Sequence, residues 1–205
     1  MLSADEIARA LKSDAAETEK LTIVPLPDLE QVRRRGGASI DLRLGRSFRS
    51  FRQTRTSSFS LVGPEPGGAA SPTEMSRIRQ HFVPFGECYV LHPGRFVLGA
   101  TLEWLRLPAG FSGYVTGKSS LGRHGLVIET AAGIHPHFSG CLTLELANVG
   151  EVPLEIYPGM EVCQIFLHRI EPCEASELGQ FSGRRKPILP PPRADAVFRK
   201  LAGWT

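Results

Sequence analysis

The chain has 205 residues, with 24 Lys and Arg against 21 Asp and Glu, so its formal net charge is +3. This length suits one domain, or one domain with a short appendage, and 41% hydrophobic residues exclude a disordered polymer. No stretch approaches the roughly 18 apolar residues of a transmembrane helix. The charge balance is too mild to indicate nucleic-acid binding. We therefore expect neither a membrane nor a nucleic acid as a partner.

The cysteines and the N-terminal segment indicate the compartment. No two of the four cysteines have the C-x-x-C spacing that is typical of structural zinc sites. The first residues lack a basic segment followed by an apolar one, so they do not form a secretory signal. We expect all four thiols to be reduced and the protein to be cytoplasmic. Cys141 and Cys163 lie in apolar runs, which predicts that they are small core residues.

The predicted elements begin with one helix and continue with many strands. Ser3 followed by Glu6 is a capping box, and the apolar spacing after it predicts a helix over about residues 3–13. From Ile23 onward, Gly and Pro separate short alternating segments, which is typical of strands joined by turns. A Gly-, Pro- and Ser-rich segment, residues 62–72, predicts an exposed loop. The predicted strands are residues 39–44, 47–52, 81–83, 88–91, 95–105, 113–116, 126–129, 140–148, 154–156 and 161–169.

The composition changes after Pro172. The segments Gly183–Pro187 and Pro190–Pro192 cannot form the interior of a helix or a strand. Residues 193–202 predict a final helix with Val197 and Leu201 on one face. A basic tail stiffened by proline either folds over another part of the molecule or is a solvated terminus.

A polar turn follows the predicted strand that ends at Gly117. Residues 118–123 supply a lysine, two serines and an arginine, which are hydrogen-bond donors suited to an anion or a phosphate. The spacing is not that of a P-loop. The alternative is an ordinary polar turn with two solvated cations.

The segment Gly140–Asn148 alternates strictly with a period of two. Its leucines share one face, which suits the main core, and its other side chains share the opposite face. The leucines are Leu142, Leu144 and Leu146, and the opposite face carries Cys141, Thr143, Glu145 and Ala147. The opposite face is small and mixed, with room for a ligand beside the carboxylate. Glu145 is therefore either a solvent-facing strand residue or a buried base with a raised pKa.

His135 and His137 suggest a metal pair at first sight. No third ligand has a suitable spacing, and Pro136 interrupts the regular backbone between the two histidines. We therefore predict no metal ligands in this chain. The zinc deaminase signature is also missing, so a deamination here would proceed without zinc.

Five segments in register resemble the dCTP deaminases of the trimeric dUTPase superfamily. They are Gly37–Gly45 (GASIDLRLG), Tyr89–Gly94 (YVLHPG), Gly117–Arg123 (GKSSLGR), Phe138–Asn148 (FSGCLTLELAN) and Tyr157–Met160 (YPGM). The resemblance implies a mainly β, dUTPase-like distorted barrel or jelly-roll with short terminal helices. It also implies a homotrimer with active sites between subunits. On this basis residues 1–172 form the dUTPase-like domain, and residues 173–205 form a tail that closes over the site.

The resemblance implies zinc-independent deamination of dCTP to dUTP and ammonia in pyrimidine deoxynucleotide metabolism. Glu145 would be the general base that takes a proton from water, while Ser119 and Arg123 hold the water and polarise the tetrahedral centre. Residues 118–120 would hold the triphosphate, with Mg²⁺ bridging its phosphate oxygens. The implied substrate-binding residues are Lys118, Ser119, Ser120, Leu121, Gly122, Arg123, Ala131, Ala132, His135, Thr143, Leu144, Glu145, Gln164, Phe181 and Arg185.

The chain departs from the family pattern at four places. Lys118 stands where the family has an arginine, which keeps the charge but loses the bidentate geometry. His135 replaces an aspartate that contacts the deoxyribose 3′-hydroxyl in the superfamily and orients the attacking water in dUTPases. The segment from Arg123 to Glu145 is one residue shorter than in typical bacterial dCTP deaminases, which removes an arginine near the base. The tail lacks a clear tyrosine and the glycine-rich closing motif of dUTPases.

These departures leave three hypotheses. The first is a dCTP deaminase, which Glu145, Ser119 and Arg123 together support. The second is a dUTP diphosphohydrolase, alone or combined with deamination, against which His135 argues. The third is a catalytically altered paralogue that binds a nucleotide for regulation or acts on a modified nucleotide; His135, Lys118 and the shorter segment motivate it.

Overall fold

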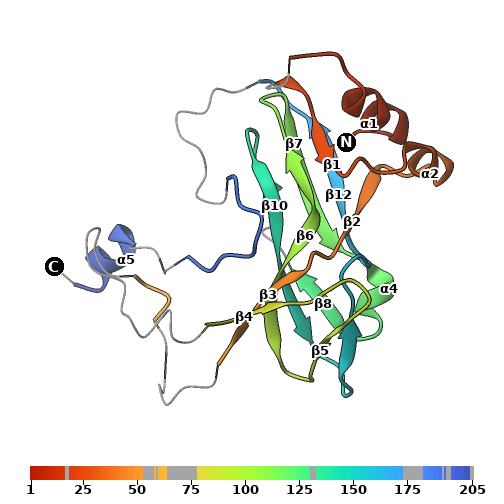
Figure 1. Ribbon diagram of the computed structural model, residues 1–205. Coiled ribbons are helices and arrows are strands. Elements are labelled where there is room, and N and C mark those ends of the chain that lie inside the picture. The colour runs from red at the N-terminus through yellow and green to blue at the C-terminus, as the bar shows by residue number, and fades with distance from the viewer. Residues whose placement is uncertain are drawn as a thin grey trace.

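The structure is a computed structural model that describes residues 1–16, 19–52, 58, 60–63, 78–129, 133–172, 182–190, 192 and 195–203. These residues are mainly β, as predicted, and their strands form three antiparallel sheets with short helices at the ends of the chain (Figure 1). Among these residues, no helix is both long and apolar enough to span a membrane.

Two short helices bracket the first strand. In α1 (Ala4–Leu11) the predicted capping box is present: the Glu6 backbone N–H donates to Ser3 Oγ at 3.3 Å, and the Ser3 N–H donates to Glu6 Oε2 at 2.9 Å. The sequence interpretation missed α2 (Leu29–Arg34), although its N-cap Asp28 has a typical signature. The Asp28 carboxylate accepts from two backbone N–H groups, those of Glu30 at 3.0 Å and Gln31 at 3.1 Å.

The first sheet carries the predicted Glu145 strand at its centre. Its order is β4–β3–β6–β10–β8, and β1 also pairs with β6. The long strands β6 and β10 form its middle. The backbone of β10 is therefore hydrogen-bonded to a neighbouring strand on each side. Its strands are β1 (Thr22–Val24), β3 (Ser47–Phe51), β4 (Ile78–Phe82), β6 (Phe96–Arg106), β8 (Leu126–Glu129) and β10 (Ser139–Asn148).

The second sheet has the order β2–β12–β7–β9, and a two-stranded sheet pairs β5 with β11. The predicted strands are confirmed with bounds that differ by at most three residues. The sequence interpretation missed β1 and β9; β9 has only two residues, which are too few to show an alternating pattern. The strands of these sheets are β2 (Ser39–Arg43), β5 (Tyr89–Leu91), β7 (Phe111–Gly117), β9 (Gly133–Ile134), β11 (Leu154–Ile156) and β12 (Glu161–Arg169).

The core lies between the inward faces of the two larger sheets. Leu142, Leu144 and Leu146 of β10 are at most 8% exposed, which confirms the predicted apolar face. Cys163 is fully buried, as predicted. Cys141 is only half-buried, and the prediction that it is a core residue was wrong, because its odd position on β10 turns it to the outward face. Cys88, Cys141 and Cys163 are unpaired, and Cys173 lies outside the described residues.

The described part of the tail runs beside the start of β10 (Figure 1). The Gly183 N–H donates to the Ser139 carbonyl at 2.6 Å, and the Cys141 N–H donates to the Arg184 carbonyl at 2.7 Å. Arg184 therefore forms one parallel bridge with Gly140. We had expected no strand-like contact in residues 183–187.

The final helix, α5 (Ala196–Leu201), is confirmed but shorter than predicted. Its Val197 and Leu201 side chains are 69% and 84% exposed, so their predicted shared face is not buried against the described residues. The predicted loop at residues 62–72 lies almost wholly outside the described residues.

Candidate functional site

The predicted polar turn is a single helical turn, α4 (Ser119–Gly122), which follows β7 directly. Lys118 is its N-cap and Arg123 its C-cap, and the Arg123 N–H donates to the Ser119 carbonyl at 3.1 Å. Leu121 packs against the core and anchors the turn. The side chains of Ser119 and Arg123, like that of Ser120, are exposed. The turn therefore presents two hydroxyls and a guanidinium to solvent.

Gly117 lies very close to the backbone of strand β8. A Cβ atom at this position would lie 3.0 Å from Ile128 Cβ and 3.1 Å from the Ile128 carbonyl oxygen. Both distances are tighter than ordinary contacts, so only glycine fits without displacement. The close contact with β8 therefore fixes where α4 begins.

Two carboxylates engage the Lys118 ammonium. Its Nζ lies 2.8 Å from Glu161 Oε2 and 3.1 Å from Asp41 Oδ2. Arg35 hydrogen-bonds Asp41 and lies 3.8 Å from Glu161. Burial alone lowers the pKa of Lys118, but the bonds to Glu161 and Asp41 outweigh it, so this pKa is raised. The same bond to Lys118 lowers the pKa of Glu161 despite partial burial. Lys118 is thus tied to β2 and β12, and the exposed donors of the turn are Ser119, Ser120 and Arg123.

Gln164 lies beside this charged group. On β12 it is opposite Asp41 of β2 and Thr116 of β7, and its Oε1 accepts from Ser39 Oγ at 3.2 Å. Because Asp41 binds Lys118, the structure brings Gln164 close to the base of the α4 turn.

Glu145 lies on the outward face of β10 and is exposed, so within the single chain it is the solvent-facing alternative that is observed and not the buried one. In the sheet it is opposite Leu98 of β6 and Glu129 of β8. Side chains directly opposite on antiparallel strands have Cβ atoms about 5 Å apart on the same face. Two carboxylates therefore share this patch. Sequence reasoning missed Glu129, because the pattern of β8 alone does not reveal its register with β10.

A bulge lies next to Thr143 on this face. The β10–β6 pairing runs from Cys141–Trp104 to Thr143–Ala100, so β6 carries extra residues between them. Thr101 Oγ1 replaces the missing ladder partner, because it accepts from the Leu142 N–H at 2.9 Å. Bulges bend a strand and re-aim side chains, and they are common beside active sites.

Glu103 points into the interior, where it is 2% exposed, because it shares the inward face of β6 with Leu105. Its carboxylate accepts from the Arg43 backbone N–H at 2.8 Å and lies 3.4 Å from the Arg43 guanidinium. Burial nevertheless raises the pKa of Glu103 above its ordinary value, and the contacts with Arg43 only partly oppose this. Glu103 therefore does not reach the outward face that carries Glu145.

Several other predicted site residues can also be placed. His135 is exposed in the turn between β9 and β10, and His137 in the same turn has a left-handed φ of 63°. Leu144 is fully buried, so a substrate could meet only its backbone. Ala131, Ala132 and Phe181 lie outside the described residues. Within the described ranges, no three His, Cys, Asp or Glu side chains are grouped as metal ligands.

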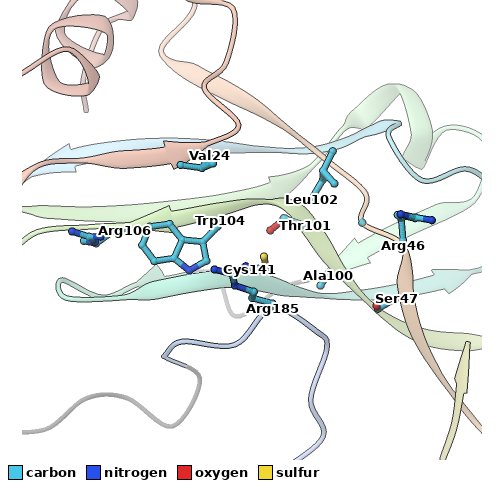
Figure 2. A pocket seen from close by; sticks show the side chains of 11 residues that line it. Val24, Arg46, Ser47, Ala100, Thr101, Leu102, Trp104, Arg106, Cys141 and Arg185 are labelled. Atoms are coloured by element: carbon cyan, nitrogen blue, oxygen red, sulfur yellow. The ribbon is translucent and has the colours of Figure 1, made fainter. Parts of the chain in front are cut away.

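Arg185 lies at a pocket of about 560 Å³ on the outward face of the first sheet (Figure 2). Cys141 also lines the pocket, together with Trp104 and Arg46. Partial burial raises the pKa of Cys141, and the nearby Arg185 charge opposes this shift. The pocket adjoins the predicted base-binding face, because Ala100 lines it and is opposite Thr143.

The candidate residues thus form two separate groups on one chain. Thr143 and Glu145 lie on the first sheet, and the turn at residues 118–123 lies where β7 meets α4. Among the described residues, no hydrogen bond or ion pair joins the two groups. Each group is open to solvent on its outward side.

Comparison with known proteins shows the family. A family model described as dCTP deaminase-like matches residues 1–170. The chain is 41% identical over 169 residues to a protein of Corynebacterium diphtheriae named "dCTP deaminase, dUMP-forming", with 79% of this chain and 84% of that protein covered. It is likewise 41% identical over 170 residues to a protein of that name from Mycolicibacterium smegmatis, with 80% and 84% covered.

A solved structure agrees with the architecture. The 2′-deoxycytidine 5′-triphosphate deaminase from Agrobacterium tumefaciens superposes with a TM-score of 0.57 at 25% identity. The match covers 83% of this chain and 47% of that one, so the chain spans about half the length of that protein.

The curated relatives differ from the sequence-based expectation in one respect. We expected dUTP as the product, whereas the relatives carry dUMP in their names. The predicted dUTPase-like fold and the predicted family are both confirmed. The chain belongs to the dCTP deaminase-like family.

Proposed function

We propose that this protein hydrolyses the exocyclic amino group of the cytosine in dCTP. The observation that carries the proposal is the position of Glu145, whose carboxylate projects outward from the central strand pair of a rigid sheet. The pairing of β10 with β6 and β8 fixes the backbone at Glu145, so the direction in which its side chain leaves the sheet is set. Membership of the dCTP deaminase-like family supports the same chemistry.

The chemistry follows from the residue types. Glu145 takes a proton from water, and the resulting hydroxide adds to C4 of the cytosine ring. The proton held by Glu145 passes to N3 of the ring. Glu145 then moves the proton of the added hydroxyl to the amino nitrogen, the C4–N bond breaks, and ammonia leaves as the C4 carbonyl of uracil forms. Ser119 and Arg123 donate hydrogen bonds to the oxygen of the tetrahedral centre. Thr143 lines the base-binding face beside Glu145.

We infer that the site forms between subunits of a homotrimer. In one chain Glu145 and the α4 turn are both exposed and no bond between described residues joins them. A neighbouring copy that brings its α4 turn to Glu145 would supply the donors and exclude water. Symmetric assembly around a closed ring would build the same site at each interface.

A Mg²⁺ ion would enter with the nucleotide. Asp41 and Glu161, the carboxylates nearest the turn, are already bound to Lys118. Such an ion would therefore take its ligands from phosphate oxygens and water, as is usual for Mg²⁺ with nucleotides. Ser120 would contact the phosphates themselves, whereas Ser119 and Arg123 serve the tetrahedral centre.

We propose dUMP as the final product, with pyrophosphate released alongside ammonia. The support is the name shared by relatives that are 41% identical to this chain. One feature favours dUTP as a second candidate: by the resemblance, His135 stands where dUTPases have the aspartate that orients the water for phosphate attack. The turn that carries His135 is exposed and borders β10, so its imidazole is available to a bound nucleotide.

One assay separates these outcomes. The purified protein is incubated with dCTP and Mg²⁺, and ammonia, pyrophosphate and the nucleotide product are followed together. Ammonia with an equal amount of pyrophosphate indicates dUMP, and ammonia alone indicates dUTP. Nucleotide binding without ammonia would overturn the deaminase and favour the altered paralogue.

A further inference from the structure

A series of bonds through the interior connects the α4 turn with the strand that carries Thr143 and Glu145, although no single bond between described residues joins them. The series begins at the N-cap of α4, where Lys118 Nζ lies 2.8 Å from Glu161 Oε2. The other carboxylate oxygen of Glu161, Oε1, lies 3.7 Å from the Arg43 guanidinium. Arg43 is opposite Glu161 in the β2–β12 pair, so Glu161 is shared between the turn and the end of β2.

Arg43 carries this series from the second sheet to the first. Its guanidinium lies 3.4 Å from Glu103 Oε1, and its backbone N–H donates to Glu103 Oε2 at 2.8 Å. Just beyond Arg43 the chain leaves β2 and crosses to the first sheet (Figure 1), and Leu44 forms a bridge with Thr101 of β6. The contact between Arg43 and Glu103 therefore lies where the two larger sheets meet.

The last bonds of the series reach β10 beside Thr143. The Thr101 hydroxyl donates to the Glu103 carbonyl at 2.8 Å and accepts from the Leu142 backbone N–H at 2.9 Å. Thr101 and Glu103 are each 2% exposed, so these bonds are shielded from water. Leu142 directly precedes Thr143 on the strand that carries Glu145. We call the series from Lys118 to Leu142 the interior connection.

The Arg43–Glu103 pair is better suited to fixing a position than to raising stability. Taking a carboxylate out of water is costly, and an apolar pair of the same size is often as stable as a buried ion pair. The cost is offset only when the two partners meet in a specific geometry. The pair therefore defines where the end of β2 lies relative to the bulge of β6.

We propose that Arg43 is a positioning residue for deamination, which holds the α4 turn in a fixed place relative to the strand that carries Glu145. It acts through Ser119 and Arg123, the donors of that turn. This inference rests on the proposed function. In the inferred homotrimer one chain gives Glu145 to one interface and its α4 turn to the next, so the interior connection sets the spacing of neighbouring active sites. A displacement of about 1 Å at a reacting group can lower a rate about a hundredfold.

The variant Arg43→Gln tests the proposal through steady-state ammonia release from dCTP. Because the donors of the tetrahedral centre are displaced, kcat should fall at least about tenfold, and by a larger factor than KM changes.

Arg33→Gln is the matched control. Like Arg43, Arg33 lies beside two carboxylates, those of Asp5 at 3.0 Å and Glu30 at 3.2 Å. Its side chain is 37% exposed, against 39% for Arg43. It lies on α2, outside the interior connection, so its variant should keep the wild-type kcat.

A double variant separates positioning from folding. Arg43→Gln alone leaves the Glu103 carboxylate buried without its guanidinium, which lowers the thermal midpoint. Adding Glu103→Gln removes the second charge and keeps an oxygen that can accept from the backbone N–H of position 43, so the midpoint should recover. The rate of ammonia release should stay low, because the link to Glu161 is still broken. Recovery of the rate together with the midpoint would overturn the proposal, since Arg43 would then serve the fold alone.

Amide hydrogen exchange decides the same question without activity. In the double variant, exchange in residues 119–123 should be at least about threefold faster than in the wild type, and in Arg33→Gln it should be unchanged. Unchanged exchange at the α4 turn in the double variant would overturn the positioning role. A wild type that releases no ammonia from dCTP would contradict the proposed function, and faster exchange in the double variant would still identify Arg43 as the residue that positions the turn.

Discussion

Glu145 occupies a position on β10 that is costly for the folded chain, and the proposed catalysis gives that position a use. Its outward carboxylate is directly opposite that of Glu129, and like charges opposite each other on a strand pair destabilise a sheet. A pair of this kind persists only where something else compensates, and a functional role for one member is such a compensation.

The Glu145→Gln variant tests this interpretation with two measurements, the rate of ammonia release and the thermal midpoint of unfolding. We expect ammonia release from dCTP to fall by at least about a hundredfold, the usual contribution of a general base. Because the substitution relieves repulsion with Glu129, the thermal midpoint should stay the same or rise slightly. Glu151→Gln, at an exposed turn, is the control and should keep wild-type activity. Equal rates for Glu145→Gln and wild type would remove Glu145 from the mechanism.

His135 is the residue at which this chain departs most clearly from the family pattern. An imidazole differs from a carboxylate in geometry and in hydrogen-bonding capacity, so sugar selection should respond to it. We expect His135→Asp to change the ratio of dCTP to CTP turnover by at least about threefold, the scale of a modest hydrogen bond. His92→Asp, at an exposed site between β5 and β6, serves as the control. Identical ratios in all three proteins would defeat this prediction.

At the scale of elements, the α4 turn depends on its contact with β8. In Gly117→Ala the new Cβ would meet Ile128 at about 3 Å, so the variant should lose about 1–3 kcal/mol of unfolding free energy. Gly122→Ala, one turn away, meets nothing within 4 Å and should be neutral or stabilising. Urea denaturation of both variants measures the difference. Equal stability would show that the contact does not position α4.

The Lys118 network links β7 to β2 and β12, and its contribution should depend on pH. The folded-state pKa of Glu161 is lowered from 4.5, so its stabilisation is present above pH 4.5 and is lost as the pH falls through the folded value. The pKa of Lys118 is raised from 10.5, so its share is present below pH 10.5 and is lost at higher pH.

Glu161→Gln measures this contribution. At pH 7 the variant should be about 1 kcal/mol less stable than the wild type, as expected for a partly exposed ion pair. At an acidic pH below the lowered folded-state pKa of Glu161, the wild-type carboxylate is protonated as well, so the difference should shrink. Denaturant titrations at the two pH values check the prediction. A difference that is the same at both would show that Glu161 acts through packing alone.

The elements that the sequence predicted are those with enough residues to show a pattern. The capping box at Ser3 and the alternation of β10 can each be recognised from neighbouring residues alone, and the structure confirms both. The two-residue β9 carries too little information, and the register of Glu129 against Glu145 depends on the whole sheet. The Arg46–Arg185 pocket joins residues about 140 positions apart in the sequence, a contact that no local pattern contains.

At the scale of the whole molecule, the proposed site needs more than one chain. The exposed Glu145 of one subunit and the exposed α4 turn of the next would complete each other. The outward face that carries Glu145 and Glu129 is exposed in the single chain and would be covered only when subunits assemble. Variants of the two groups should therefore complement each other.

Subunit complementation tests this central claim most directly. Glu145→Gln and Ser119→Ala are each prepared alone, where both should release little ammonia from dCTP, and are then unfolded and reassembled together. Random mixing in a closed ring leaves about a quarter of the sites with both groups intact, so the mixture should regain about that fraction of wild-type activity. A reassembled mixture as inactive as its parents, beside a wild type that regains full activity after the same treatment, would contradict a site built from Glu145 of one subunit and Ser119 of another.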